Sequence, residues 1–133
     1  MRYLALIAHD AKKAEMIALC RRWRDILAAE DLVATRTTGE AIQREVGLKV
    51  STVLSGPLGG DLQIGALIAT EKVKAVIFLR DPLTAHPHEP DIAALMKACD
   101  THNVPLATNT AAAELLFCAL SSGCSAPPEA DGK

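Results

Sequence analysis

The chain has 133 residues; half of them are hydrophobic, only 3% are aromatic, and the formal net charge is −2. This length suits one compact domain with a real core. The slightly acidic charge gives no reason to expect nucleic acid or a membrane surface as a partner. The arginines at positions 21, 22 and 24 lie together and are interpreted as a solvated helix face.

The four cysteines, at positions 20, 99, 118 and 124, form no Cys-x-x-Cys pair and match no zinc-site spacing. Cys20, Cys99 and Cys118 fall on apolar helical stripes, where we expect small buried side chains. This usage indicates a reducing, cytoplasmic location. The N-terminal apolar run over 3–8 is too short for a signal peptide, and no run approaches the length of a membrane span.

Strand-like and helix-like patterns alternate along the chain. Thr37 and Glu40 are spaced as a capping box at the start of the second helix, which Gly47 ends. In chain order, the predicted elements are a strand (3–8), a helix (12–29), a strand (32–35), a helix (37–46), a strand (50–54), a helix (62–71), a strand (75–79), a helix (90–102), a strand (104–107) and a helix (110–120).

This alternation predicts an α/β fold, a three-layer α/β/α domain with a central five-stranded parallel sheet. We expect the domain to span residues 1–120 and residues 121–133 to form a flexible C-terminal tail, because the tail is rich in Gly, Ser, Pro and charge. Ligands of such sheets bind at the carboxyl ends of the strands. The polar residues that follow the five strands are therefore the candidates for a common site.

Nearly every residue suited to chemistry follows one of these strands. They are His9, Asp10 and Lys13; Thr35, Arg36, Thr37, Thr38 and Gly39; Ser55 to Asp61; Arg80, Asp81, His86, His88 and Asp91; and Thr108, Asn109 and Thr110. Because the carboxyl ends of parallel strands share one edge, we expect these groups to converge.

The turn Ser55-Gly-Pro-Leu-Gly-Gly-Asp61 runs directly into a predicted helix. Its glycines allow backbone N–H groups to approach a ligand, and a helix N-terminus attracts anions. With the hydroxyls of 35–38 and Lys13, this turn predicts a phosphate cradle. Two interpretations of Asp61 remain open, a helix cap or a base acting on a bound phosphate ester.

The segment 81–91 combines His86, His88 and Asp91 with several prolines, which stiffen a loop. A carboxylate beside a histidine is the usual arrangement for proton transfer or for polarising a carbonyl. A zinc site is the rival interpretation, but His86-Pro-His88 is not a helical i, i+4 pair, so we expect no metal. No cysteine is placed as a nucleophile.

These motifs closely resemble those of the methylglyoxal synthase family. The matching blocks run in order over most of the chain. They are Ala8-His-Asp10 with Lys13, Thr35 to Gly39, Leu54-Ser-Gly-Pro-Leu-Gly-Gly-Asp61 with Gln63 and Gly65-Ala-Leu-Ile68, Phe78 with Asp81-Pro-Leu83, Pro87-His88 with Pro90-Asp91, and Pro105-Leu-Ala-Thr-Asn109.

The resemblance implies a methylglyoxal synthase-like fold, a homohexamer, and a carbon–oxygen lyase without metal or cofactor. The reaction implied converts dihydroxyacetone phosphate to methylglyoxal and inorganic phosphate through an enediolate. By the resemblance, Asp61 is the base and His88 polarises the carbonyl, while Asp91 and Asp10 orient the site and relay protons. The residues implied to hold the substrate are His9, Lys13, Thr35, Thr37, Thr38, Ser55 and Gly56.

The chain departs from this family pattern at two places. The family's phosphate loop usually reads Thr-Gly-Thr-Thr-Gly, and here Arg36 replaces the first glycine. The family also commonly carries an arginine in a longer C-terminal segment that reaches a neighbouring subunit's phosphate, whereas this sequence has no arginine after Arg80. We hypothesise that Arg36 binds substrate and partly replaces that cation; the alternative is a tolerated surface change.

Two other functions remain open at this point. Related domains serve as allosteric regions of carbamoyl phosphate synthetase, so a non-catalytic phosphate-ligand-binding module is the main alternative. An isomerase that returns the proton to the enediolate is the other. The presence of Asp61, His88 and Asp91 together favours the lyase.

Overall fold

The computed structural model describes residues 2–122. Its strands are β1 (Tyr3–Ala8), β2 (Leu32–Thr35), β3 (Ser51–Val53), β4 (Val73–Leu79) and β5 (Leu106–Ala107). Its helices are α1 (Lys13–Arg22), α2 (Arg24–Ala28), α3 (Arg36–Val46), α4 (Gly60–Ala69), α5 (Glu89–Thr101) and α6 (Thr110–Ser121), with 3-10 turns η1 (Asp10–Lys12) and η2 (Gly56–Leu58).

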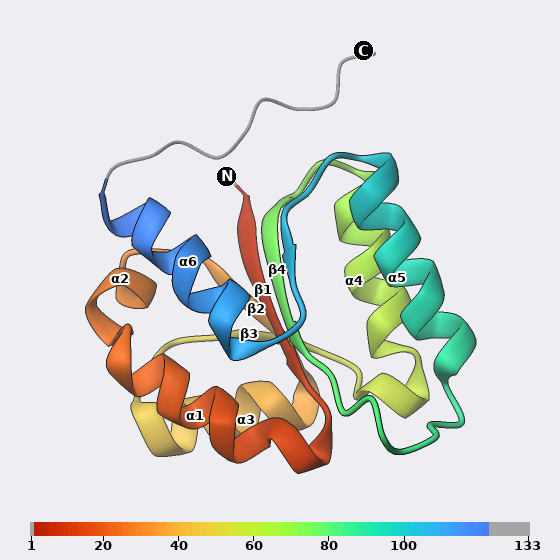
Figure 1. Cartoon of the computed structure of the whole chain (residues 1–133), viewed down its shortest axis with the longest axis horizontal. Coiled ribbons are helices and arrows are strands. Elements are labelled where there is room, and N and C mark those ends of the chain that lie inside the picture. Colours follow the sequence, from red (N-terminus) through yellow and green to blue (C-terminus); the bar gives the residue numbers. More distant parts are fainter. Residues whose placement is uncertain (1, 123–133) are drawn as a thin grey trace.

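The five strands form one parallel sheet in the order β3-β2-β1-β4-β5. Helices α1, α2, α3 and α6 cover one face, and α4 and α5 cover the other (Figure 1). The predicted three-layer α/β/α fold with five parallel strands is therefore confirmed. The strand order reverses at β1, which pairs with β2 on one side and with β4 on the other, so a ligand crevice is expected at their carboxyl ends.

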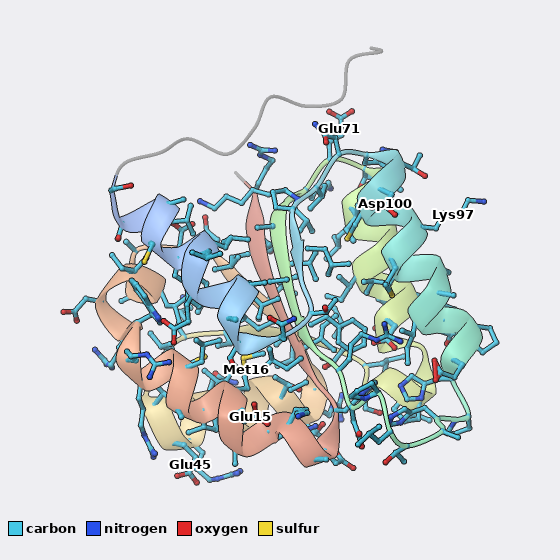
Figure 2. All side chains as sticks on the ribbon, viewed as in Figure 1. Glu15, Met16, Glu45, Glu71, Lys97 and Asp100 are labelled. Atoms are coloured by element: carbon cyan, nitrogen blue, oxygen red, sulfur yellow. The ribbon has the colours of Figure 1, made fainter. Side chains whose placement is uncertain are left out.

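Each face of the sheet buries its own apolar cluster. Phe117 and Met16 belong to the cluster under α1 and α6, and Ile64 and Leu95 to the cluster under α4 and α5. Figure 2 shows Met16 pointing from α1 toward the sheet, while the neighbouring Glu15 points away from it. The central strands are buried on both faces, which explains their continuous apolar runs.

The predicted helix over 12–29 is wrong as a single element, because the chain breaks it at Trp23. The Trp23 backbone leaves the helical region at φ −106° and ψ 23°. Its indole packs toward Phe117, with ring centroids 5.8 Å apart, and its Nε1 donates to a Glu114 carboxylate oxygen at 2.7 Å. The contacts of Trp23 with α6 therefore break the helix that the sequence periodicity predicts as continuous.

The predicted capping box is also wrong. Thr35 is the N-cap of α3 and ends β2 with an extended backbone, so Thr37 already lies in the first helical turn. No side chain caps this helix. The strand leads into the helix with no intervening loop, and this leaves no room for Thr37 outside the helix.

Two glycines shape the turn before α4 for different reasons. Gly59 has a φ of +103°, the left-handed region that favours glycine. Gly60 is needed for close packing, because a Cβ there would lie 1.9 Å from the carbonyl oxygen of Leu54. This packing puts Asp61 inside the first turn of α4, past its N-cap, so the cap interpretation of Asp61 is wrong.

Cys20 and Cys99 are buried as expected, but the expectation for Cys118 is wrong, because it lies on the exposed side of α6. Within residues 2–122, no helix has both the length and the apolarity to cross a membrane. The predicted tail, residues 121–133, lies outside the described residues from 123 onward.

Candidate active site

A cavity of about 460 Å³ opens at the carboxyl ends of β1, β2 and β4, at the lower edge of the sheet in Figure 1. The segments that follow the first four strands all contribute to its wall, so the predicted convergence is confirmed for these four; the predicted group after β5, residues 108–110, does not line the cavity. Eight of the predicted site residues line it: His9, Asp10, Lys13, Thr35, Thr37, Gly56, Asp61 and His88.

Asp61 is the most constrained acid of this cavity. Its side chain is 1% exposed, and neither carboxylate oxygen has a hydrogen-bond partner among residues 2–122. His88 Nε2 lies 3.5 Å from one of these oxygens. Burial raises the pKa of Asp61; the nearby His88 opposes this effect, and Asp91 adds to it. A buried carboxylate of raised pKa is a stronger base than an exposed one, which suits proton abstraction.

Gly56 lies beside the Asp61–His88 pair and has no side chain to enter the space between them. A Cβ at Gly56 would lie 3.1 Å from His88 Nε2 and 3.5 Å from an Asp61 carboxylate oxygen. The missing side chain therefore keeps open the gap in which the acid and the imidazole face each other.

His9 lies at the end of β1 and is 7% exposed. The backbone N–H of Asp81 donates to its Nδ1 at 2.8 Å, so a neutral His9 carries its proton on Nε2. That Nε2 is buried without a partner among the described residues. The pKa of His9 is lowered to about 4, mainly by burial and further by the positive charges that His86, His88 and Arg80 can carry, while the Asp81 carboxylate opposes the shift. His9 is therefore a neutral N–H donor in the wall of the cavity.

The cavity wall includes a lysine that is held by its neighbours. Lys13 Nζ donates to the carbonyl of Ala8 and to the Asp10 carboxylate, both at 2.9 Å. The Asp10 side chain is fully exposed, and the hydrogen bond from Lys13 lowers its pKa. Asp10 thus stays a carboxylate that steadies Lys13 at the cavity rim.

Three helical turns begin at this cavity. Their N-caps are His9 for η1, Thr35 for α3 and Ser55 for η2, and none of the three has a side-chain cap. Uncapped N–H groups of a first turn remain available to an anion, and the backbone dipoles favour negative charge there. The geometry is that of an acid–imidazole pair beside helix N-termini that have no side-chain cap.

The comparisons with known proteins agree with this arrangement. The family model for the MGS-like domain matches residues 15–108. The chain belongs to the MGS-like family. Methylglyoxal synthase of Thermus thermophilus is 63% identical over 92% of this chain and 98% of its own length.

Two further relatives extend the comparison. Methylglyoxal synthase of Cupriavidus metallidurans is 60% identical over 91% of this chain and 86% of its own length. The crystal structure of methylglyoxal synthase from Elizabethkingia anophelis superposes with a TM-score of 0.82 at 39% identity, covering 87% of this chain and 76% of that one. These relatives confirm the predicted membership of the methylglyoxal synthase family and the prediction of an enzyme of that type.

Four predicted site residues of this MGS-like domain do not line the cavity. Arg36 is exposed at the start of α3, and Asp91 lies in the first turn of α5, where its N–H donates to the His88 carbonyl. Thr38 is buried behind the cavity; it accepts from the Ala8 N–H and lies 3.3 Å from the Ala8 carbonyl oxygen. Ser55 is the N-cap of η2, and its carbonyl accepts from Leu58 and Gly60.

Three further polar residues line the cavity: Asp81 and His86, which the sequence analysis named as candidates without giving them a role, and Thr84, which it did not name. His86 is the most notable, because its ring stacks on His9. The motif His86-Pro-His88 indicated that both histidines belong to one stiff loop, but not that His86 would stack on His9. Among residues 2–122, no group of three or more His, Cys, Asp and Glu side chains is arranged to hold a metal ion.

Proposed function

We propose that this chain converts dihydroxyacetone phosphate to methylglyoxal and inorganic phosphate. The observation that carries the proposal is the buried Asp61 carboxylate, unpartnered within the described chain and 3.5 Å from His88, in a cavity lined by Lys13 and by uncapped helix N-termini. A substrate with an acidic C–H, a carbonyl and a phosphate matches this cavity: the C–H gives its proton to Asp61, the carbonyl accepts from His88, and the phosphate binds Lys13 and the helix N-termini. The high identity to enzymes named methylglyoxal synthase supports the same reaction.

In the first step, Asp61 takes a proton from the hydroxymethyl carbon, and the electron pair moves toward the carbonyl oxygen. His88 stabilises the enediolate oxygen through its imidazole, and the buried N–H of His9 is a second donor for the developing charge. A carboxylate base paired with an electrophilic imidazole is the arrangement used by aldose–ketose isomerases. Asp91, beside the pair, helps to keep the Asp61 pKa raised.

In the second step, the C–O bond to phosphate breaks and inorganic phosphate leaves. The remaining enol returns to the keto form as methylglyoxal. Elimination competes with reprotonation when this C–O bond stands perpendicular to the enediolate plane, so the cradle must fix that angle as well as bind charge. We propose that Lys13, Thr35, Thr37 and the N–H groups at Gly56 do so, because they line the cavity, and that Thr38, bonded to Ala8, and the N-cap Ser55 support this wall.

The decisive experiment supplies dihydroxyacetone phosphate and follows methylglyoxal and phosphate together. We expect both products in equal amounts from the wild type, and no turnover above background from Asp61→Asn. Glyceraldehyde phosphate without phosphate release would indicate an isomerase. Tight binding of substrate with no product would indicate a binding module.

A substitution at Arg36 tests whether this residue contributes to substrate binding. We propose that it attracts the substrate phosphate from outside the cavity wall, because its guanidinium is exposed at the N-terminus of α3. Arg36→Gly would then raise KM, with kcat little changed. An unchanged KM would make Arg36 a surface substitution.

We also propose that the chain assembles as a homohexamer in the cytoplasm. Leu54, Leu58 and Leu62 are 40%, 71% and 51% exposed around η2 and the start of α4, beside the edge strand β3, and apolar surface of this kind favours self-association. Light scattering on the purified chain measures the mass directly. A monomer would contradict the assembly.

A further inference from the structure

The ring of His86 covers one face of the His9 imidazole. The two centroids lie 3.9 Å apart, and the rings are nearly parallel, at 24°. His9 meets two other rings only edge-on, Phe78 at 5.1 Å and His88 at 5.9 Å. Its Nδ1 accepts the Asp81 N–H, which fixes one atom of the ring but leaves the ring free to tilt about that bond.

A tilt of this ring would move the atom that matters for chemistry. His9 Nε2 lies across the ring from the Asp81 contact and has no partner within residues 2–122. The stacked His86 ring opposes such a tilt, because it would separate the two faces. His86 therefore supplies a restraint that the Asp81 hydrogen bond alone does not.

We propose that His86 is a positioning residue, whose stacked ring holds His9 so that its Nε2–H faces the substrate. This inference rests on the proposed function, because it assigns the His9 donor to the substrate of that reaction. It also extends the site to a residue that acts through another side chain.

The position of His86 is itself coupled to the proposed catalytic groups. Its carbonyl accepts the Glu89 N–H at 3.2 Å, at the first residue of α5, and Pro87 stiffens the link to His88. The His88 carbonyl in turn accepts from Asp91 and Ile92. One short segment thus places the stacking ring and the proposed electrophile together.

The charges around the stack keep His9 neutral. His86 faces His9, lies 5.6 Å from the His88 ring, and is near the carboxylates of Asp10 and Asp81. A charge on either neighbouring imidazole disfavours a proton on His9, as does Arg80. A neutral His9 keeps Nδ1 as an acceptor for the Asp81 N–H, which an imidazolium cannot do.

Two variants distinguish the effect of the stacked aromatic ring of His86 from the effect of its imidazole nitrogen atoms. His86→Phe keeps an aromatic face against His9, and His86→Ala removes it. The matched control is Leu83→Ala, since Leu83 is 93% exposed in the same loop and lines no part of the cavity. Thermal unfolding of all three identifies any variant that loses the fold.

Two measurements read the result, kcat/KM with dihydroxyacetone phosphate and the ¹⁵N chemical shifts of the His9 ring. We expect His86→Ala to lower kcat/KM about tenfold, a fraction of the loss from deleting an anion-stabilising donor. The Asp81 N–H still fixes the tautomer of His9, so the His9 ring signals should broaden or double as the ring tilts. His86→Phe should keep a single sharp set of His9 ring signals and most of the activity, and Leu83→Ala should match the wild type.

The inference is overturned if His86→Ala keeps sharp, unshifted His9 ring signals and wild-type activity, or if His86→Phe is as impaired as His86→Ala. Binding of glycerol 3-phosphate, which lacks the carbonyl and cannot react, separates this failure from a failure of the proposed function. A wild type that binds this ester but forms no methylglyoxal would contradict the function. Loss of His9 order in His86→Ala would still establish the positioning contact.

Discussion

Gly56→Ala directly perturbs the gap between the proposed base and its imidazole partner. The added Cβ would lie 3.1 Å from His88 Nε2, whereas carbon–nitrogen contacts prefer about 3.5–4.0 Å, so His88 must move by about half an ångström. A displacement of about 1 Å in an active site costs about a hundredfold in rate. We therefore expect kcat to fall about tenfold, or about 1.4 kcal/mol in activation free energy.

The same substitution should leave the fold almost unchanged. Gly56 does not have a positive φ, and the Cβ meets only side-chain atoms, 3.5 Å away in the case of Asp61. Gly65→Ala is the matched control, because a Cβ there has no neighbour within 4 Å and Ala stabilises a helix interior by about 0.5–1 kcal/mol over Gly. It should keep full activity with a slightly higher Tm.

The assay measures kcat and KM from methylglyoxal formation and Tm from thermal unfolding. A Gly56→Ala enzyme with wild-type kcat would refute the reasoning, because the gap would then tolerate a methyl group. A fall in Tm comparable to that of a core cavity would instead assign Gly56 to folding and not to the geometry of the site.

Three further predictions concern stability. Gly60→Ala should cost about 3 kcal/mol or more, because its Cβ would lie 1.9 Å from a backbone carbonyl oxygen that cannot move aside, and urea unfolding measures the loss. Cys20→Ser should cost about 1–3 kcal/mol by placing a hydroxyl in the core, whereas Cys118→Ser should stay within about 0.5 kcal/mol; equal costs would contradict the assigned burial. Burial raises the pKa of Asp61 from 3.8, so its contribution to stability is complete below pH 3.8 and is lost as pH rises through the folded-state value. The Tm of Asp61→Asn relative to wild type should therefore increase as the pH rises above 3.8, and a constant difference would be inconsistent with a raised pKa.

The sheet and its edge were predictable because both follow from simple patterns. Strands buried on two faces need continuous apolar runs, as in β4, and the residues after parallel strands share one edge. This rule alone predicts that His9, Thr35, Asp61 and His88 lie close together, and all four line the cavity. The break at Trp23 was not predictable, because it depends on a contact with Glu114, 91 residues away in the chain.

Side-chain direction explains most of the remaining differences at the site. Thr37 faces the cavity, whereas Thr38, one residue later on α3, turns toward β1 and bonds the backbone of Ala8. Arg36 turns toward solvent. The sequence correctly predicted that all three residues lie at this edge of the sheet. Their side-chain directions depend on where α3 begins, and the predicted cap at Thr37 put this start too late in the chain.

The heptapeptide that joins β3 to α4 shows why this site is costly for the fold. Gly60 lets the chain pass within van der Waals range of the Leu54 carbonyl, and Gly59 adopts a left-handed φ, so that the helix starts before Asp61. An acid placed two residues beyond the N-cap Gly59 loses the N–H partners that a capping side chain would have, and here it is almost fully buried. A protein selected for stability alone would place a capping residue here. A buried carboxylate that faces an imidazole but has no hydrogen-bond partner within residues 2–122 is instead what a proton-abstracting base requires, because the same burial that weakens the fold raises the pKa of Asp61.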